Sequence, residues 1–156
     1  VNNKMLVNFD RRYTDEMRAE TTEMGYTVRD IVIIASMIER ETDGTDRATI
    51  ASVIYNRLNN TSAETVGTLG VDATLVYALG RPITQADYTA DTPYNTYTNK
   101  GLPPGPISNP GMESINAAME PADTNYYYYA LGSDGKHQFF RTLAEQQAFI
   151  AQQRGE

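Results

Sequence analysis

Residues 27–42 read TVRDIVIIASMIERET and form the most apolar helical pattern in the chain. Thr27, followed three residues later by Asp30, is a capping-box pattern, which predicts that a helix begins just after Thr27. The apolar positions of this helix share one side: Ile31, Ile34 and Ile38. We therefore expect residues 28–41 to form the central helix of a hydrophobic core.

Working outward, the sequence predicts further helices and one hairpin. Apolar periodicity and capping residues place the helices at residues 5–24, from Asp46 to Asn59-Asn60, from Asp72 to Gly80, from Asn109-Pro110 to just before Pro121, and at 143–153. Thr84 with Asp87 predicts one more helical turn. Residues 126–131 and 137–141 are typical of strands joined through Ser133-Asp134-Gly135. The expected fold class is α+β, mostly helical, with a small β element.

Composition narrows the class of protein. The 156 residues suit one domain, expected as residues 1–26, an N-terminal helix, leading into a core over residues 27–153. The net charge of −7 comes without a basic patch, so nucleic-acid binding is not expected. Cysteine is absent and histidine occurs once, so neither a metal nor another cofactor is expected. No apolar run has the roughly 20 residues that span a bilayer.

Glu39 is the first candidate for chemistry. At about 100° per residue, it falls beside small or apolar positions of its helix: Val32, Ala35 and Ser36. Such surroundings disfavour a charged carboxylate, so we expect a raised pKa and a role as general acid. The alternative is an ordinary surface residue at a helix end, paired with Arg40 or Arg47.

Several blocks along the chain form a family pattern. They are residues 35–42 (ASMIERET), 50–58 (IASVIYNRL), 93–97 (PYNTY), 101–104 (GLPP), 106–107, 109–111, 114–118, 121–122 and 135–139 (GKHQF). In this order and spacing, the chain resembles the MltG-type (YceG-like) endolytic murein transglycosylases over most of residues 27–150.

The resemblance implies a lysozyme-like fold and a lyase acting on peptidoglycan. Such an enzyme cuts the β-1,4 bond between N-acetylmuramic acid and N-acetylglucosamine within a strand and leaves a 1,6-anhydro-muramic end. Glu39 would protonate the glycosidic oxygen and then accept the proton of the attacking C6 hydroxyl. Because that hydroxyl is already tethered, one carboxyl group can suffice. The implied role is to terminate or trim nascent glycan strands.

The resemblance also implies a cellular setting. Family members carry a membrane anchor and a LysM-like subdomain before the catalytic domain, and neither is expected in this chain. The enzyme would act at the extracytoplasmic face of the bacterial cell membrane and touch the membrane only through that anchor. Its expected partners are peptidoglycan glycan strands and cell-wall synthases, and we expect a monomer.

Substrate-binding residues carry over from the matching motifs. The expected set is Asn56, Asp72, Thr74, Tyr94, Asn95, Thr96 and Tyr97. The last four match a cleft-lining motif of the family. The alternative is that these residues only stabilise the loop, through hydrogen bonds of Asn95 and packing of the Tyr rings. Asn56 could face Glu39 or simply sit near a helix end, and Asp72 could be a plain helix cap. The family's Gln before Asp72 and Pro after it are missing here, where Gly70, Val71 and Ala73 stand.

Two other functions remain open, besides a weaker reading as an interaction scaffold for cell-wall synthesis. A muramidase-type hydrolase would need a second carboxylate, for which Asp72, Asp87 or Asp91 could serve. A non-catalytic peptidoglycan-binding module would release no product. For His137, on the predicted hairpin, we expect a packing or hydrogen-bonding role.

Overall fold

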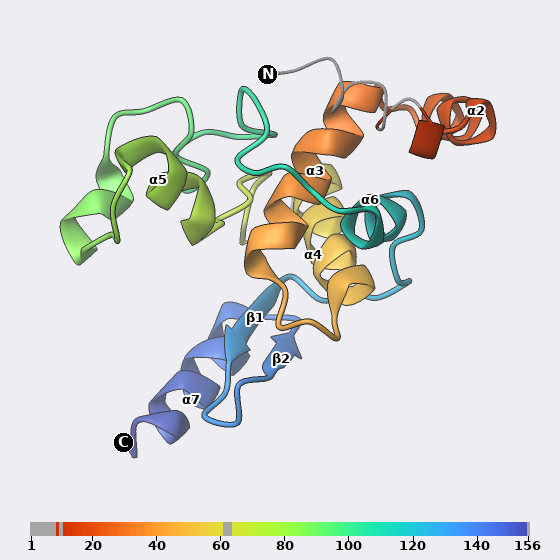
Figure 1. The fold of residues 1–156 in the computed structure, drawn as a ribbon. Coiled ribbons are helices and arrows are strands. Elements are labelled where there is room, and N and C mark those ends of the chain that lie inside the picture. Colours follow the sequence, from red (N-terminus) through yellow and green to blue (C-terminus); the bar gives the residue numbers. More distant parts are fainter. Residues whose placement is uncertain (1–8, 10, 61–63, 156) are drawn as a thin grey trace.

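The structure, a computed structural model, describes residue 9 and residues 11–60 and 64–155. Its central helix is α3 (Val28–Glu41), and reciprocal hydrogen bonds between Thr27 and Asp30 confirm the predicted capping box. Figure 1 shows α3 running through the middle of the molecule, and α4 (Arg47–Asn59) and α6 (Met112–Met119) pack against it.

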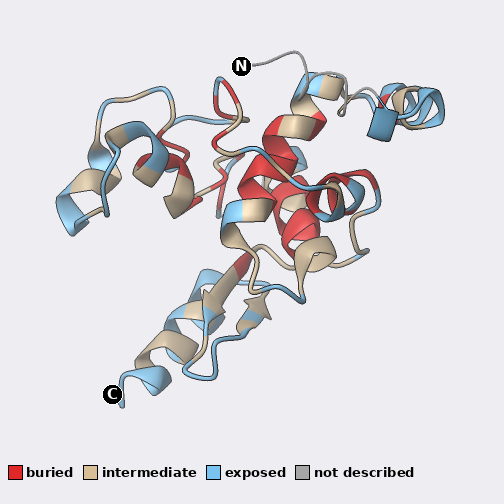
Figure 2. Cartoon of the chain, viewed as in Figure 1, coloured by how far each residue is buried: buried red, intermediate tan, exposed pale blue. Residues whose placement is uncertain are grey.

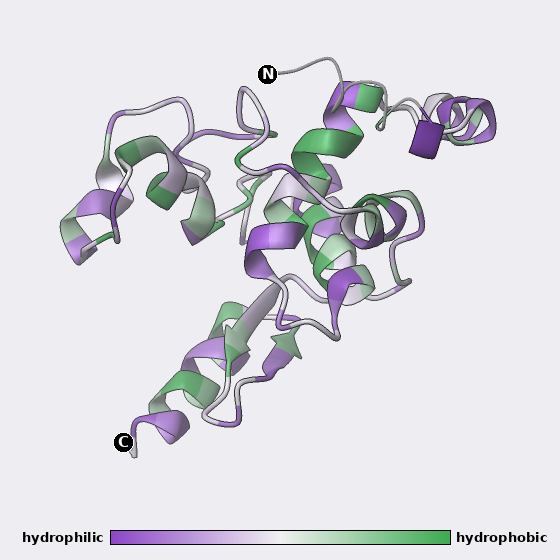
Figure 3. Cartoon of the chain, in the orientation of Figure 1, coloured by the Kyte–Doolittle hydropathy of each residue, from purple (hydrophilic) through white to green (hydrophobic). Residues whose placement is uncertain are grey.

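The core lies among these three helices, where burial is concentrated (Figure 2). Ile31, Ile34 and Ile38 are each 0% exposed, which confirms the apolar face predicted for α3. Burying one such side chain stabilises the fold by roughly 1.5–3 kcal/mol. The apolar middle of α3 gives way to a hydrophilic C-terminal end, shown in Figure 3. The helix therefore anchors the core with one half and presents polar side chains with the other.

The N-terminal helix differs from its prediction. The structure has α2 (Asp15–Glu23), and the Thr14 side chain accepts a hydrogen bond from the Met17 N–H at its start. A continuous helix over residues 5–24 is therefore wrong, because a capping threonine interrupts the periodic pattern. Gly25 ends the helix with φ of +86°, as expected. Residues 5–8 and residue 10 of the predicted helix lie outside the described residues.

Two smaller units flank the core. One contains α5 (Asp72–Leu79) and the 3₁₀ helix η1 (Gln85–Thr89), with the predicted capping box of Thr84 and Asp87. The other is the antiparallel hairpin of β1 (Tyr128–Leu131) and β2 (His137–Phe140), followed by α7 (Leu143–Gln153). In Figure 1 the C-terminal end of α3 lies between the two units. The mixed α+β class is thus confirmed.

Two predicted helix starts are corrected. Helix α6 begins at Met112 with Gly111 as its N-cap, two residues later than expected from Asn109-Pro110. The N-cap of α5 is Val71, and Asp72 is the first helical residue, so Asp72 does not cap that helix. None of the helices in the described part of the chain has the length and apolar character needed to cross a bilayer.

Candidate active site

Two carboxyl groups leave the C-terminal end of α3 on different sides. Glu39 and Glu41 are two positions apart, so their side chains diverge by about 200° around the helix axis. Glu39 meets the N-terminal end of α6, whereas Glu41 meets the hairpin. The same helix end therefore offers two chemically different acids.

Glu39 is held as a carboxylate. Its Oε1 accepts hydrogen bonds from the Gly111 N–H (3.0 Å) and the Ser114 hydroxyl (2.9 Å). The Gly111 bond, then the Ser114 bond, lower the pKa of Glu39 against the opposing effect of burial, and the charge of Arg47 adds to the lowering. The expected rise in the pKa of Glu39 is therefore wrong in direction. The helix pattern showed its apolar neighbours within α3 but could not show the donors that α6 brings.

Glu41 has the opposite character. Its Oε1 accepts a 2.5 Å hydrogen bond from the Tyr129 hydroxyl of β1. Burial raises the pKa of Glu41 above its ordinary value, and the nearby charge of Asp72 raises it further, against the Tyr129 bond and the charges of His137 and Arg40. A carboxyl group that keeps its proton to higher pH is suited to general acid work. Glu41 is not among the residues predicted from the sequence, because only the tertiary contacts reveal this environment.

Asp72 faces the same region from α5. Its Oδ1 accepts a short hydrogen bond from the Tyr97 hydroxyl, and its Oδ2 accepts one from the Tyr88 hydroxyl at 3.2 Å. Burial and then the bond to Asp72 raise the pKa of Tyr97, so this hydroxyl stays protonated and donates. The rings of Tyr88 and Tyr97 meet edge to face at 4.9 Å. The structure thus brings the predicted residues Asp72 and Tyr97 together, close enough to Glu41 for their charges to interact.

The middle of the predicted cleft motif is buried. Asn95 is 0% exposed, donates to the carbonyls of Tyr88 and Ala90, and accepts from the Tyr97 N–H. Thr96 accepts from the Val71 N–H at 2.8 Å. These groups are used within the loop, and they place Tyr97 beside α5. The structure therefore favours a scaffolding role for the two central residues of the motif.

The other predicted binding residues are spread more widely. Asn56 donates to the carbonyls of Thr124 and Tyr126, both at 2.9 Å, which ties α4 to the segment before β1. Thr74 is buried and bonds to the Val71 carbonyl and the Thr96 hydroxyl. Tyr94 is half-buried, and its ring lies 5.2 Å from that of Tyr77. Within the described ranges, these hydrogen bonds and ring contacts of Asn56, Thr74 and Tyr94 do not reach Glu39 or Glu41.

Gly70 lies close to the side chain of Arg57. It has φ of +59°, where a residue with a side chain is strained. A Cβ there would lie 2.7 Å from Nη2 of Arg57 and 3.3 Å from Cε1 of Tyr97. Arg57 fills that space by bonding to the carbonyls of Thr68 and Tyr127. A glutamine cannot enter this position without displacing Arg57.

His137 lies in a closed cluster with Asp43 and Asp46. Its Nδ1 is 2.6 Å from Oδ2 of Asp46, which confirms the expected hydrogen-bonding role. These three side chains are also the one grouping of metal-type donors among the described residues. The carboxylate oxygens of Asp43 and Asp46 already accept hydrogen bonds from Thr42, Thr45 and His137. The cluster therefore holds the loop after α3 against strand β2.

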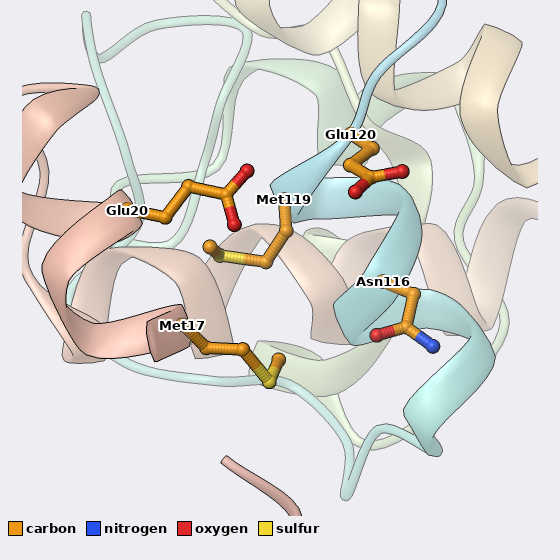
Figure 4. A pocket seen from close by; sticks show the side chains of 5 residues that line it. All are labelled: Met17, Glu20, Asn116, Met119 and Glu120. Atoms are coloured by element: carbon orange, nitrogen blue, oxygen red, sulfur yellow. The ribbon is translucent and has the colours of Figure 1, made fainter. Parts of the chain in front are cut away.

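A pocket of about 340 Å³ lies elsewhere, between α2 and α6 (Figure 4). It is lined by Met17, Glu20, Asn116, Met119 and Glu120. None of the predicted site residues lines it. This pocket is therefore separate from the two glutamates at the C-terminal end of α3.

Taken together, the site combines two glutamates of the central helix with an aspartate of α5 and the tyrosine hydroxyls that contact these carboxyl groups. The YceG-like family is matched over residues 1–152, and the chain belongs to this family.

Known relatives agree with this membership. An endolytic murein transglycosylase of Bacillus subtilis is 38% identical over 146 residues, which cover 91% of this chain and 39% of that protein. One from Streptococcus pneumoniae is 37% identical over 120 residues, or 70% of this chain and 21% of that protein. A crystal structure of a YceG-like protein from Listeria monocytogenes has a TM-score of 0.77 at 40% identity, covering 85% of this chain and 43% of that one. The chain thus spans less than half the length of these relatives.

Proposed function

We propose that this chain is the catalytic part of an endolytic murein transglycosylase, a lyase that cuts peptidoglycan glycan strands. Family membership and the names of the curated relatives support the reaction class. The proposed bond is the β-1,4 link between N-acetylmuramic acid and N-acetylglucosamine, and the proposed product end is 1,6-anhydro-muramic acid. A lysozyme-like arrangement, a monomer, a site of action outside the cell membrane and a role in terminating or trimming strands belong to the same proposal.

The sequence proposed Glu39 as the acid, and the geometry favours Glu41. The observation that carries this choice is the burial of Glu41 under the Tyr129 hydroxyl, which leaves its pKa raised, while two donors lower that of Glu39. A general acid must hold a proton near the working pH, and Glu41 meets that need better. Glu39 then serves to fasten α6 to α3. The role of Glu39 as acid stays a prediction to be tested beside it.

The proposed reaction balances with one carboxyl group. Glu41 gives its proton to the glycosidic oxygen as the bond from that oxygen to C1 of muramic acid breaks. The C6 hydroxyl of the same sugar then bonds to C1, and its proton passes to the Glu41 carboxylate. Because the attacking hydroxyl is part of the substrate, no water is consumed. Asp72, whose oxygens accept hydrogen bonds from the hydroxyls of Tyr88 and Tyr97, would stabilise the positive charge that develops at C1.

A muramidase-type hydrolase is the main alternative. It requires a second carboxylate that activates water or attacks carbon. Asp87 is paired with Arg81 at 2.7 Å, and both oxygens of Asp72 already accept tyrosine hydroxyls. These contacts occupy the oxygens of Asp87 and Asp72 and disfavour both as the base that activates water.

Digestion of purified sacculi followed by mass spectrometry tests the reaction type. The lyase gives fragments lighter by one water than the hydrolase product. Fragments with reducing muramic ends would establish hydrolysis instead, and binding without release would establish a non-catalytic module.

A further inference from the structure

The loop between α3 and α4 is fastened to the hairpin by one histidine. The His137 N–H donates to Oδ2 of Asp43 at 3.0 Å, and Nδ1 lies 2.6 Å from Oδ2 of Asp46. A carboxylate can only accept, so Nδ1 carries the hydrogen in this bond. The side chains of His137, Asp43 and Asp46 are 9%, 4% and 9% exposed. This group of three residues, the His137 clamp, therefore fixes the imidazole ring in one orientation.

The fixed ring supports Tyr129. The two rings meet edge to face, with centroids 5.0 Å apart and an interplanar angle of 77°. Phe139 packs against Tyr129 from the same strand as His137, with centroids 5.8 Å apart. The Tyr129 hydroxyl ends this chain of contacts on Oε1 of Glu41.

We propose that His137 is a positioning residue, whose clamped ring holds the Tyr129 hydroxyl on the carboxyl group of Glu41. The inference rests on the proposed function, in which Glu41 gives and takes the proton. Tyr129 can turn about its side-chain bonds unless neighbours pack against its ring. Loss of the histidine ring therefore lets the hydroxyl leave Glu41, and a misplaced acid costs rate more than it costs binding.

The charge environment sets the expected pH effect. Glu41 faces Tyr129 from β1, His137 from β2, Asp72 from α5, the Tyr97 hydroxyl from the loop after η1, and Arg40 from its own helix. The Tyr129 bond and the charge of His137 both favour the carboxylate. Without them the pKa of Glu41 rises further. Since the protonated acid is the active form, the basic limb of the activity profile moves to higher pH.

The test compares His137→Ala, His137→Asn and the control Gln138→Ala, which alters an exposed side chain of the same strand. Kinetics use soluble uncrosslinked glycan strands. For His137→Ala we expect kcat to fall roughly ten- to a hundredfold, KM to stay nearly unchanged and the basic limb to move up. His137→Asn keeps a donor for Asp46 but lacks the ring. It should recover most of the thermal stability and still show the lowered kcat as well as the displaced limb, while the control matches the wild type.

A merely structural role makes a different prediction: asparagine restores kcat together with stability, and that result overturns the inference. An unmoved limb in His137→Ala overturns it too. If His137→Ala does not fold, the measurements on His137→Asn alone distinguish the positioning role from the structural role. The ¹³C carboxyl titration of Glu41, identified with Glu41→Gln, separates the two proposals. Full activity of Glu41→Gln would refute the role of Glu41 as general acid. An unchanged pKa of Glu41 in His137→Asn would refute the positioning role of His137.

Discussion

The Tyr129 hydroxyl donates a 2.5 Å hydrogen bond to Oε1 of Glu41, which joins strand β1 to the last residue of the central helix. Burial and the charge of Glu41 raise the pKa of Tyr129 well above its ordinary value, so the hydroxyl keeps its hydrogen throughout the working pH range. The bond stabilises the carboxylate form of an acid whose burial favours the protonated form.

Tyr129→Phe removes this one hydroxyl and keeps the ring. The pKa of Glu41 should rise, because the lost bond had lowered it. We expect the basic limb of kcat/KM to move to higher pH and kcat to fall about tenfold, since the carboxyl group loses its orientation. The control is Tyr127→Phe, whose hydroxyl bonds to Asn60 instead. A limb that stays in place in Tyr129→Phe would show that the bond does not tune the acid.

The contributions of Glu39 and Glu41 to the stability of the fold should change in opposite directions as pH rises. The folded-state pKa of Glu39 lies below its ordinary value of 4.5, so its contribution is present above that pH and is lost as pH falls. The folded-state pKa of Glu41 lies above 4.5, so its contribution is present below that pH and is lost as pH rises through the folded pKa. Thermal unfolding between pH 3 and 9 measures both.

Relative to the wild type, Glu41→Gln should therefore become more stable as pH rises, and Glu39→Gln should become less stable from acid to neutral pH. Parallel curves for the two variants would mean that their environments do not differ as described.

Features that depend on local interactions were predicted correctly from the sequence, whereas features that depend on contacts between distant residues were not. Helix α3 was predicted within its bounds because the Thr27 and Asp30 cap and the apolar face are local features. The helix wheel also placed Glu39 correctly on its own helix. It could not show that Gly111 and Ser114, more than 70 residues later, donate to that carboxylate. The same limit hid Glu41, whose partner Tyr129 is 88 residues away.

The cleft motif shows a second limit. Residue types that bind sugars, such as Asn and Thr, also build loops, and the sequence does not separate the two uses. Asn95 and Thr96 are buried and bonded within the protein, while Tyr97 reaches Asp72. Only the tertiary contacts of residues 94–97 with α5 reveal which of these side chains remain available.

Asn95→Ala tests the scaffolding role. Three hydrogen bonds of a buried side chain are lost, so we expect a loss of about 2–4 kcal/mol in unfolding free energy. The KM for glycan strands, measured where the variant is folded, should change less than about twofold, because the amide lies within the loop. Asn99→Ala, in the same loop but exposed, is the control. A large rise in KM with unchanged stability would assign Asn95 to substrate binding instead.

Gly70→Ala tests the tight approach of Arg57. Strain at positive φ costs about 1–2 kcal/mol, and displacing Arg57 adds to it. Gly80→Ala is a matched control, because Gly80 also has positive φ (+70°) but nothing lies within 4 Å of its added Cβ. Chemical denaturation should show a larger loss for Gly70→Ala than for Gly80→Ala. Equal losses would show that the backbone alone, without Arg57, requires glycine at position 70.

The most direct test is the release of anhydro-ended fragments from sacculi by Glu41→Gln and Glu39→Gln, each first shown to be folded. We predict that Glu41→Gln loses at least about a hundredfold in rate, because an amide cannot donate the proton. Glu39→Gln should retain activity within about tenfold, since an amide oxygen can still accept from Gly111 and Ser114. The reverse result, a silent Glu39→Gln beside an active Glu41→Gln, would contradict the assignment of the acid.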